Sequence, residues 1–344
     1  MLPADETAEL QALIDNTPAD TFLEFDRNWN CNGTIQITKP VRIDFKGFFI
    51  RAITDLSETL DGTSTKRLAR RARAHVRILN TGGVDLVSPW IIGAHPNGGF
   101  ADSAYDPDAE AQHGLDILNS SDVSIYDAVV SDVYGDFCYV GKGSRKVYVN
   151  GLHGRRNGRQ GIAVSSGADI AFYNLDLDLV RRTMIDLEPN KGSERVERVL
   201  IKGATIGEAR ANFLSCSSAA GHIGDITLRD INSVMPFRSN VGSELVPNRG
   251  PFFFQNMNFV KWHGSPLQCC IKVINTQGLA FDSCRVPTQP GRSMKFIKTE
   301  GASSNIVVSN CEFPNAVDTV HQDSGPVMTY GNSIGTNFVD EPEF

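Results

Sequence analysis

A short β-rich unit recurs along most of the chain, and this repeat constrains the fold more than any other feature of the sequence. Successive copies begin 23 to 29 residues apart. One coil of a solenoid needs a length of this order, and stacked coils would bury a shared core. The first apolar residues of the eight copies are Val123, Val147, Ile170, Val199, Ile226, Phe252, Leu279 and Ile306.

Each copy alternates apolar and polar residues, which is typical of a strand with one buried face. A single turn residue then interrupts the copy, mostly of a type that tolerates left-handed backbone. These turn residues are Asp127, Gly151, Asn174, Gly203, Asp230, Asn256, Ser283 and Asn310. An apolar column follows at once: Ala128, Leu152, Leu175, Ala204, Ile231, Met257, Cys284 and Cys311. A turn of one residue followed by another strand predicts the corner of a β-helix.

A second strand of each coil aligns at residues 115–117, 138–140, 162–164 and 185–187, with the middle residue facing outward. The pattern predicts an all-β chain, a single-stranded right-handed parallel β-helix of about eight to ten coils. Leucine-rich repeats would need regular leucines and asparagines, which this chain lacks, and a β-sandwich would need hairpin turns. In this fold, columns of the alignment become rows on the surface, about 4.8 Å apart.

Residues 7–25 predict an amphipathic helix that ends near Asn16 and is followed by a strand. A solenoid must cover its open end, so this helix is expected to be the N-terminal cap. Residues 35–45 and 76–92 would supply the first coils. We expect a cap and lead-in at residues 1–30, the β-helix at 31–320 and a C-terminal tail at 321–344.

The net charge of −7 and the pI near 5.5 argue against a general surface for nucleic acid or anionic membrane, because both need a net basic face. The seven cysteines are odd in number and lack zinc-ligand spacing, so they predict neither a zinc site nor a disulfide framework. The N-terminus lacks the pattern of a signal peptide, and no apolar run is long enough to span a membrane.

Outward polar residues concentrate in the coils from residue 113 to residue 190. Stacking would place His113, Asp136, Gln160 and Thr183 in one row, and Asp116, Tyr139, Ala163 and Asp186 in the next. We expect four carboxyl groups to be the catalytic candidates: Asp136, Asp186, Glu188 and Asp116. We expect the substrate-binding candidates to be His113, Tyr139, Arg159, Gln160 and Arg182.

Asp186 and Glu188 lie two residues apart on one strand face, about 7 Å from each other. Glycosidases that invert need their carboxyls about 6.5–9.5 Å apart, so this spacing permits hydrolysis. Asp116 and Asp186 would be about 14 Å apart, which is too far. The alternatives stay open: Glu188 ends the strand in a polar turn, and Asp136 bonds its own backbone after Gly135.

A lyase would need a cation and a basic residue, and Arg159 and Arg182, one coil apart, are placed to face an acidic sugar; they also suit a solvated edge paired with aspartates. The histidines lack metal-ligand spacing, and the sequence predicts no metal or cofactor. The basic run at residues 66–73 suits contact with teichoic acid, DNA or an acidic sugar, and it equally suits a solvated loop or short helix. Trp90, Tyr134, Tyr139 and Trp262 suit stacking on sugars or packing between coils.

Residues 113–164 resemble the core of polygalacturonases and their pectin-lyase-like relatives, whose motifs read NTDGID, GDDC and GHGI. His113 stands where that family has its first catalytic aspartate. Asp136 keeps the first aspartate of the pair, Phe137 replaces the second, and Gln160 replaces the histidine. The resemblance therefore implies a β-helix, while the departures argue against polygalacturonase activity.

GRQGIAV at residues 158–164 and IDLEPN at 185–190 are similar to pectin-lyase-like tail and spike proteins of bacteria and bacteriophages. This resemblance implies the fold more strongly than the function. We expect a virion-associated, tailspike-like protein that binds a host surface polysaccharide as a homo-oligomer or with other virion proteins, and that binds neither membrane nor nucleic acid. The alternatives are a polysaccharide hydrolase or lyase and a purely structural virion component.

Overall fold

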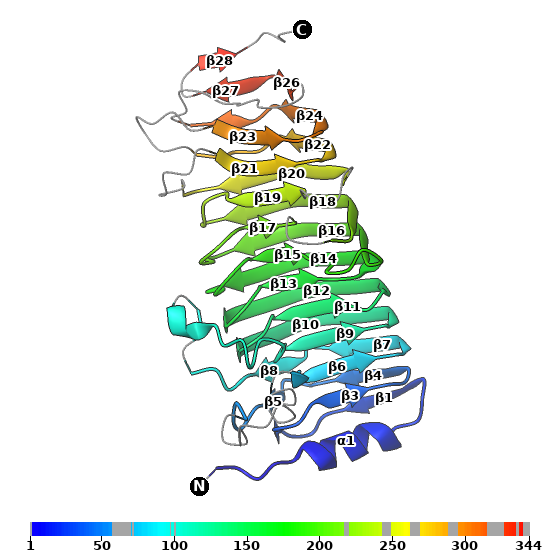
Figure 1. The fold of residues 1–344 in the computed structure, drawn as a ribbon. Helices are drawn as coiled ribbons and strands as arrows, with labels where there is room; N and C mark the ends of the chain where they lie inside the picture. Colours follow the sequence, from blue (N-terminus) through cyan, green and yellow to red (C-terminus); the bar gives the residue numbers. More distant parts are fainter. Residues whose placement is uncertain are drawn as a thin grey trace.

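In the computed structural model, short parallel strands stack into a long β-helix with the N-terminal helix at one end (Figure 1). The structure describes residues 2–56, 70, 72–96, 98–99, 101–216, 220–242, 249–261, 269–287, 295–314, 327–334 and 337–339. The predicted parallel β-helix is confirmed, and the chain winds once through both main sheets in each coil.

The two main sheets are called the long sheet and the short sheet below. The long sheet runs in the order β1 (Thr21–Glu24), β4 (Val41–Asp44), β7 (Gly82–Val87), β10 (Ser121–Val133), β12 (Ser144–Asn157), β14 (Gly167–Asp178), β16 (Arg195–Ile206), β18 (His222–Ser233), β20 (Phe252–Phe259), β22 (Gln277–Asp282), β24 (Ser304–Ser309) and β26 (Val327–Tyr330). Three further strands pair beside it: β2 (Trp29–Asn30), β5 (Phe49–Arg51) and β8 (Trp90–Ile92).

The short sheet supplies the other side of each coil. Its strands are β3 (Ile35–Ile37), β6 (Val76–Leu79), β9 (Leu115–Leu118), β11 (Cys138–Gly141), β13 (Ile162–Val164), β15 (Ile185–Leu187), β17 (Leu214–Ser215), β19 (Ser239–Gly242), β21 (Cys269–Ile274) and β23 (Lys295–Glu300). A small third sheet joins β25 (Glu312–Phe313), β27 (Asn332–Ile334) and β28 (Asn337–Val339). Strands therefore continue past residue 320 into the segment expected to be a tail, and the division of the chain into three parts stays a prediction.

Helix α1 (Thr7–Asn16) covers the first coil, as predicted. Leu10 and Ile14 are one turn apart and are both buried against that coil. Gln11 ties the helix to the coil, because its side chain donates to the Gln36 carbonyl and accepts the Gln36 backbone N–H. The helix ends before Pro18, in front of which helical backbone is disfavoured.

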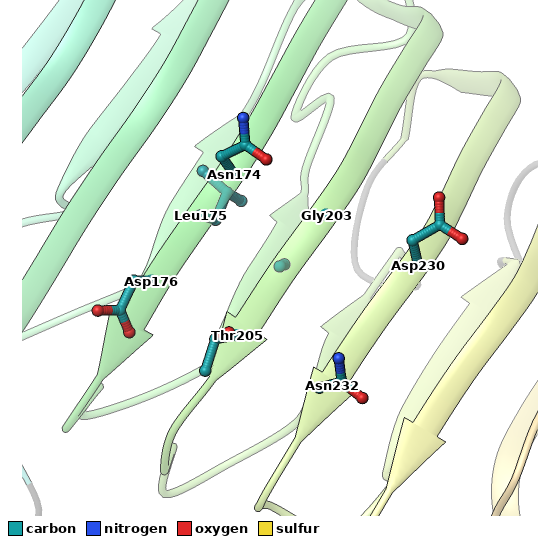
Figure 2. Close-up of a pocket in the computed structure, with 8 residues that line it drawn as sticks. Asn174, Leu175, Asp176, Gly203, Thr205, Asp230 and Asn232 are labelled. Atoms are coloured by element: carbon teal, nitrogen blue, oxygen red, sulfur yellow. The ribbon is translucent and has the colours of Figure 1, made fainter.

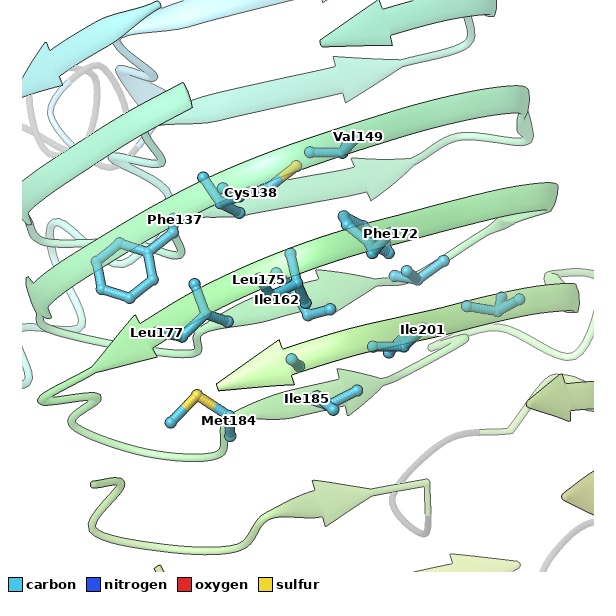
Figure 3. Close-up of a cluster of buried hydrophobic side chains, with 14 of the residues drawn as sticks. Phe137, Cys138, Val149, Ile162, Phe172, Leu175, Leu177, Met184, Ile185 and Ile201 are labelled. Atoms are coloured by element: carbon cyan, nitrogen blue, oxygen red, sulfur yellow. The ribbon is translucent and has the colours of Figure 1, made fainter. Parts of the chain in front are cut away.

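The core is a continuous apolar column between the two sheets. In Figure 3, Ile162 and Ile185 of the short sheet and Phe172, Leu175 and Ile201 of the long sheet point into it. The apolar residues that follow the corners are all buried, including Cys284 and Cys311. These two cysteines therefore pack as small apolar side chains.

The turn residues at the corners adopt the left-handed backbone conformation that their residue types predict. Every one of the eight turn residues has positive φ, from 50° at Asn256 to 79° at Gly151. Left-handed backbone costs most residues about 1–2 kcal/mol, while Gly, Asn and Asp adopt it readily. Ser283 is the one member of the column outside these three types.

Ser283→Asn is therefore expected to raise the free energy of unfolding by about 0.5–1 kcal/mol, because Asn tolerates the left-handed region better than Ser. Ser283→Val is expected to lower it by about 1 kcal/mol or more, since a β-branched residue fits that region poorly. Urea denaturation of the two variants checks the prediction. If the two variants are equally stable, the positive φ at position 283 does not determine which residue types this corner tolerates.

Candidate functional site

The predicted polar residues gather on the outer side of the short sheet, over β9, β11, β13 and β15. Asp116 lies opposite Tyr139, Tyr139 opposite Ala163, and Ala163 opposite Asp186, so the predicted register of this row is confirmed. The neighbouring row runs through the residues that precede these strands, and backbone hydrogen bonds link them from coil to coil. Stacking therefore brings residues distant in sequence into contact.

Asp136 lies at the centre of a buried network. Its Oδ2 accepts a hydrogen bond from Nη1 of Arg159 at 2.6 Å, and its Oδ1 accepts the backbone N–H of Gln160 at 2.9 Å. Burial raises the pKa of Asp136 to about 7, against the opposing attraction of Arg159. The residue is 0% exposed. Its burial leaves no surface for a ligand in this structure, and its contacts hold Arg159 in place; the catalytic role predicted for Asp136 stays a prediction.

Arg159 connects this buried aspartate to the surface. Its Nη2 donates to Oε1 of Glu188 at 2.7 Å, while Nη1 holds Asp136. The two carboxylates raise the pKa of the guanidinium although burial opposes them. The side chains of Arg159 and Glu188 are 12% and 13% exposed, so a ligand on this face would meet their edges. The bridge holds the Glu188 carboxylate in one position.

Gln160 fixes the orientation of Asp186. Its Oε1 accepts the backbone N–H of Thr183 at 2.7 Å, which leaves its Nε2 to donate to Oδ2 of Asp186. Burial, and after it the charge of Glu188, raises the pKa of Asp186 to about 8. Its other oxygen, Oδ1, is buried without a hydrogen-bond partner in the described structure.

His113 and Tyr139 stack in adjacent coils, with ring centroids 4.6 Å apart. Nδ1 of His113 accepts the backbone N–H of Asp136 at 3.0 Å, and burial holds the pKa of the imidazole well below its ordinary value. His113 is therefore neutral, and it stabilises the buried network by accepting the hydrogen bond from the Asp136 backbone. Tyr139 is half-buried, and its hydroxyl donates to Oγ of Ser165 at 2.6 Å. Of this pair, only Tyr139 offers appreciable surface to a ligand.

Asp116 and Arg182 stand apart from this network. Asp116 is buried and accepts Nε of Arg77 at 2.6 Å, and two strands separate it from Asp186. Arg182 is exposed, with its guanidinium 5.0 Å from the ring centre of Tyr105. Arg159 and Arg182 thus have different partners, and the hypothesis that they jointly face an acidic sugar stays a prediction.

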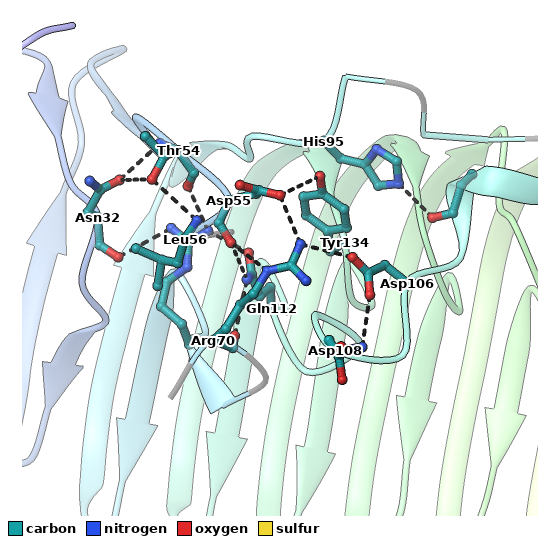
Figure 4. Close-up of polar contacts among 12 residues, drawn as sticks. Asn32, Thr54, Asp55, Leu56, Arg70, His95, Asp106, Asp108, Gln112 and Tyr134 are labelled. Carbon is teal, nitrogen blue, oxygen red and sulfur yellow. Dashed lines mark hydrogen bonds and ion pairs between the residues drawn. The ribbon is translucent and has the colours of Figure 1, made fainter. Parts of the chain in front are cut away.

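Insertions between the coils are fixed beside this site by a polar network (Figure 4). Nη2 of Arg70 bridges Asp55 at 2.8 Å and Asp106 at 2.9 Å, and the Tyr134 hydroxyl donates to Asp55 at 3.2 Å. Arg70 and Arg73 are buried, so they do not form a solvated basic surface; residues 66–69 and 71 lie outside the described residues. Tyr134 is buried too, and Trp262 also lies outside the described part.

Sequence reasoning missed Arg77, Tyr105 and the Arg70 network. Arg77 could have been found, because it occupies the outward middle position of its strand and lies opposite Asp116 in the register. Tyr105 and Arg70 lie in insertions without a repeat pattern, so no column alignment would place them.

The described residues offer neither a metal cluster nor a membrane-spanning helix. No group of three His, Cys, Asp or Glu side chains among them is arranged to hold a metal ion. None of the described helices is long and apolar enough to cross a membrane.

Comparison with known proteins identifies relatives by fold alone. No protein-family model and no curated protein sequence matches the chain. The family 28 exopolygalacturonase of Yersinia enterocolitica aligns with a TM-score of 0.59 and 9% identity, over 95% of this chain and 76% of that one. A tailspike variant of Escherichia coli bacteriophage HK620, solved with a pentasaccharide, gives 0.57 and 10%, over 96% and 63%.

The catalytic unit of a GH87 α-1,3-glucanase from Streptomyces thermodiastaticus gives a TM-score of 0.51 and 13% identity, over 100% of this chain and 69% of that one. Because the sequence identities are this low, the structural similarity shows a shared fold, the parallel β-helix, and nothing more. This chain spans less than two thirds of the tailspike chain.

Proposed function

We propose that this chain binds a polysaccharide along the outer face of the short sheet, with Glu188, Arg159 and Tyr139 as the contacting groups. The observation that carries the proposal is the fixed position of Glu188, held by Arg159, which Asp136 holds in turn. A charged acceptor fixed before binding loses little entropy when a sugar hydroxyl donates to it. Tyr139 lies one coil before Arg159 and two coils before Glu188, and it offers a ring to an apolar sugar face.

The proposed setting is a virion, in which the protein is tailspike-like and contacts a host surface glycan as a homo-oligomer or with other virion proteins. The fold likeness to a tailspike solved with a pentasaccharide supports this setting. The same fold carries glycanases, so the likeness alone favours no reaction.

Hydrolysis is the second candidate, and one observation favours it. Burial and the charge of Glu188 raise the pKa of Asp186 to about 8, which favours its protonated form near neutral pH, and Asp186 lies two residues from Glu188, the carboxylate that pairs with Arg159. A protonated and a charged carboxyl close together are the acid and the base or nucleophile that glycoside cleavage requires. Asp186 is 4% exposed, so its proton would need a local opening to reach a glycosidic oxygen.

Glu188→Gln is expected to weaken polysaccharide binding about tenfold, because it replaces the charged acceptor and breaks the bridge to Arg159. Binding to host cell-surface polysaccharide and to acidic polysaccharides is measured by affinity electrophoresis. Glu197→Gln, which breaks exposed ion pairs on the long sheet, is the matched control and should bind like the wild type. Equal binding of both variants would exclude this face.

The same incubations distinguish binding of the polysaccharide from its cleavage. New reducing ends mean hydrolysis, and new absorbance from an unsaturated uronate means elimination. If cleavage occurs and Asp186→Asn abolishes it without weakening binding, hydrolysis replaces binding as the function. Binding without cleavage supports the first proposal.

A further inference from the structure

Three tyrosines gather on the outer face of the long sheet, on a different sheet from the candidate site. Tyr126, Tyr148 and Tyr173 come from the consecutive strands β10, β12 and β14. The ring centroid of Tyr148 lies 5.8 Å from that of Tyr126 and 5.3 Å from that of Tyr173. Tyr126 is 37% exposed and the other two are half-buried. The three rings are called the tyrosine platform below.

At its two ends the platform is flanked in the sheet by Val87, opposite Tyr126, and by Lys202, opposite Tyr173. Tyr148 lies opposite Ser124 on one side and Ala171 on the other, and both side chains are small. Tyr126 and Tyr173 both lie opposite Asn150. The platform therefore spans three coils that are about 4.8 Å apart, a repeat close to the advance of one sugar unit along an extended oligosaccharide.

A chain of hydrogen bonds leads from the platform to the corner of the coils. Nδ2 of Asn174 donates to Oδ1 of Asn150 at 2.8 Å, and Nδ2 of Asn150 donates to the Tyr148 hydroxyl at 3.1 Å. The Tyr148 hydroxyl accepts in this chain, so its own proton remains available to a ligand. Both amides are fixed in orientation by these bonds.

A hollow of about 460 Å³ begins at Asn174 (Figure 2). It exists because Gly203, in the coil between those of Asn174 and Asp230, has no side chain, while the side chain of Ala204 is buried in the core. Its lining residues are Asn174, Leu175, Asp176, Gly203, Ala204, Thr205, Asp230 and Asn232. The amide, hydroxyl and carboxylate groups among them match the donors and acceptors of sugar hydroxyls.

The charged residues of the hollow are already paired within the chain. Asp176 accepts Nη2 of Arg155 at 2.7 Å. Asp230 lies 3.2 Å from Nε of Arg229 and accepts Nδ2 of Asn256 at 2.8 Å. Both aspartates already have partners, so the groups that this site offers to a ligand are its rings, amides and hydroxyls, with Lys202 beside them, opposite Tyr173.

We propose that the tyrosine platform and the adjoining hollow form a second binding site, for an uncharged oligosaccharide. The rings contact the apolar faces of successive sugars. Tyr148, Asn174 and Asp230 bond their hydroxyls. This site is independent of the candidate site on the short sheet, and neither requires the other.

The test measures binding of maltohexaose, cellohexaose and laminarihexaose to the full chain by isothermal titration calorimetry. We expect at least one of them to bind, and Tyr126→Ala combined with Tyr148→Ala to weaken that binding about tenfold or more. Tyr148→Phe keeps the ring and loses the hydroxyl, so a loss of about threefold is expected. Thermal unfolding of each variant checks that the fold is kept.

Two control variants show whether the loss of affinity is confined to the tyrosine platform. Phe253→Ala removes another exposed aromatic ring, 46% exposed, from the same sheet face, and should leave affinity unchanged. Glu188→Gln should also leave it unchanged, which separates this site from the function proposed above. The proposal is overturned if none of the three hexasaccharides binds, if the double variant binds like the wild type, or if Phe253→Ala weakens binding equally.

Discussion

Asp136→Ala is expected to lower the free energy of unfolding by about 3 kcal/mol or more, the usual effect of removing one partner of a buried ion pair. The substitution takes from Arg159 one of its two carboxylates and leaves the backbone N–H of Gln160 without its acceptor. It also opens a cavity beneath His113, whose Nδ1 lies 3.3 Å from the carboxylate. Equilibrium urea denaturation measures the change.

Asp176→Ala is the matched control for this prediction. Asp176 also pairs with an arginine, but at a half-exposed position on the long sheet, where such pairs contribute about 1 kcal/mol or less. If the two variants lose similar stability, Asp136 is not the central support of the network. Loss of glycan binding by Asp136→Ala would follow from the release of Arg159, and binding alone would not identify Asp136 as a contacting residue.

Stability is expected to fall as the pH rises from about 6.5 to 8.5. The pKa values of Asp136 and Asp186 are raised from 3.8 to about 7 and about 8 in the folded chain. Over this window the native state still holds protons that the unfolded chain has released, so stability decreases with pH. The slope is at most about 1.4 kcal/mol per pH unit for each group.

Buried histidines determine the pH range in which the effect of the two carboxyl groups on stability can be observed. The pKa values of His75, His95 and His113 are lowered by burial, so below about pH 6.5 the unfolded chain binds more protons there and stability falls with acid. The two effects oppose each other below that pH, and the carboxyl groups dominate between about pH 6.5 and 8. Near pH 8.5 the buried thiols of Cys31, Cys138 and Cys216, whose pKa values are raised by burial, begin to lower stability in the same direction. Stability is therefore expected to be highest near pH 6 to 7.

Asp186→Asn tests the assignment, because the amide keeps an acceptor for Gln160 and cannot ionise. The variant should lose much of the slope between pH 6.5 and 8.5, and Asp176→Asn should keep all of it. The measurement is the urea midpoint as a function of pH. An unchanged slope in Asp186→Asn would mean that Asp186 is already ionised at neutral pH.

The sequence by itself predicted the coils, the corner ladder and the cap. Each depends on local chemistry repeated at a fixed spacing: alternating apolar residues, turn residues that tolerate positive φ, and an amphipathic segment before the first strand. The surface rows followed directly, because parallel stacking converts the Asp116 and Asp186 column into a line of neighbours.

Only the tertiary structure decided which of those polar residues are buried and which are exposed. Asp136 and Gln160 are in the predicted row, yet both are buried, because Arg159 and Asp186 close over them from neighbouring coils. Arg182 lies against Tyr105, and Tyr105 belongs to an insertion that has no repeat pattern. Burial depends on what packs against a side chain from other coils and insertions, and a column of residue types carries no information about that packing.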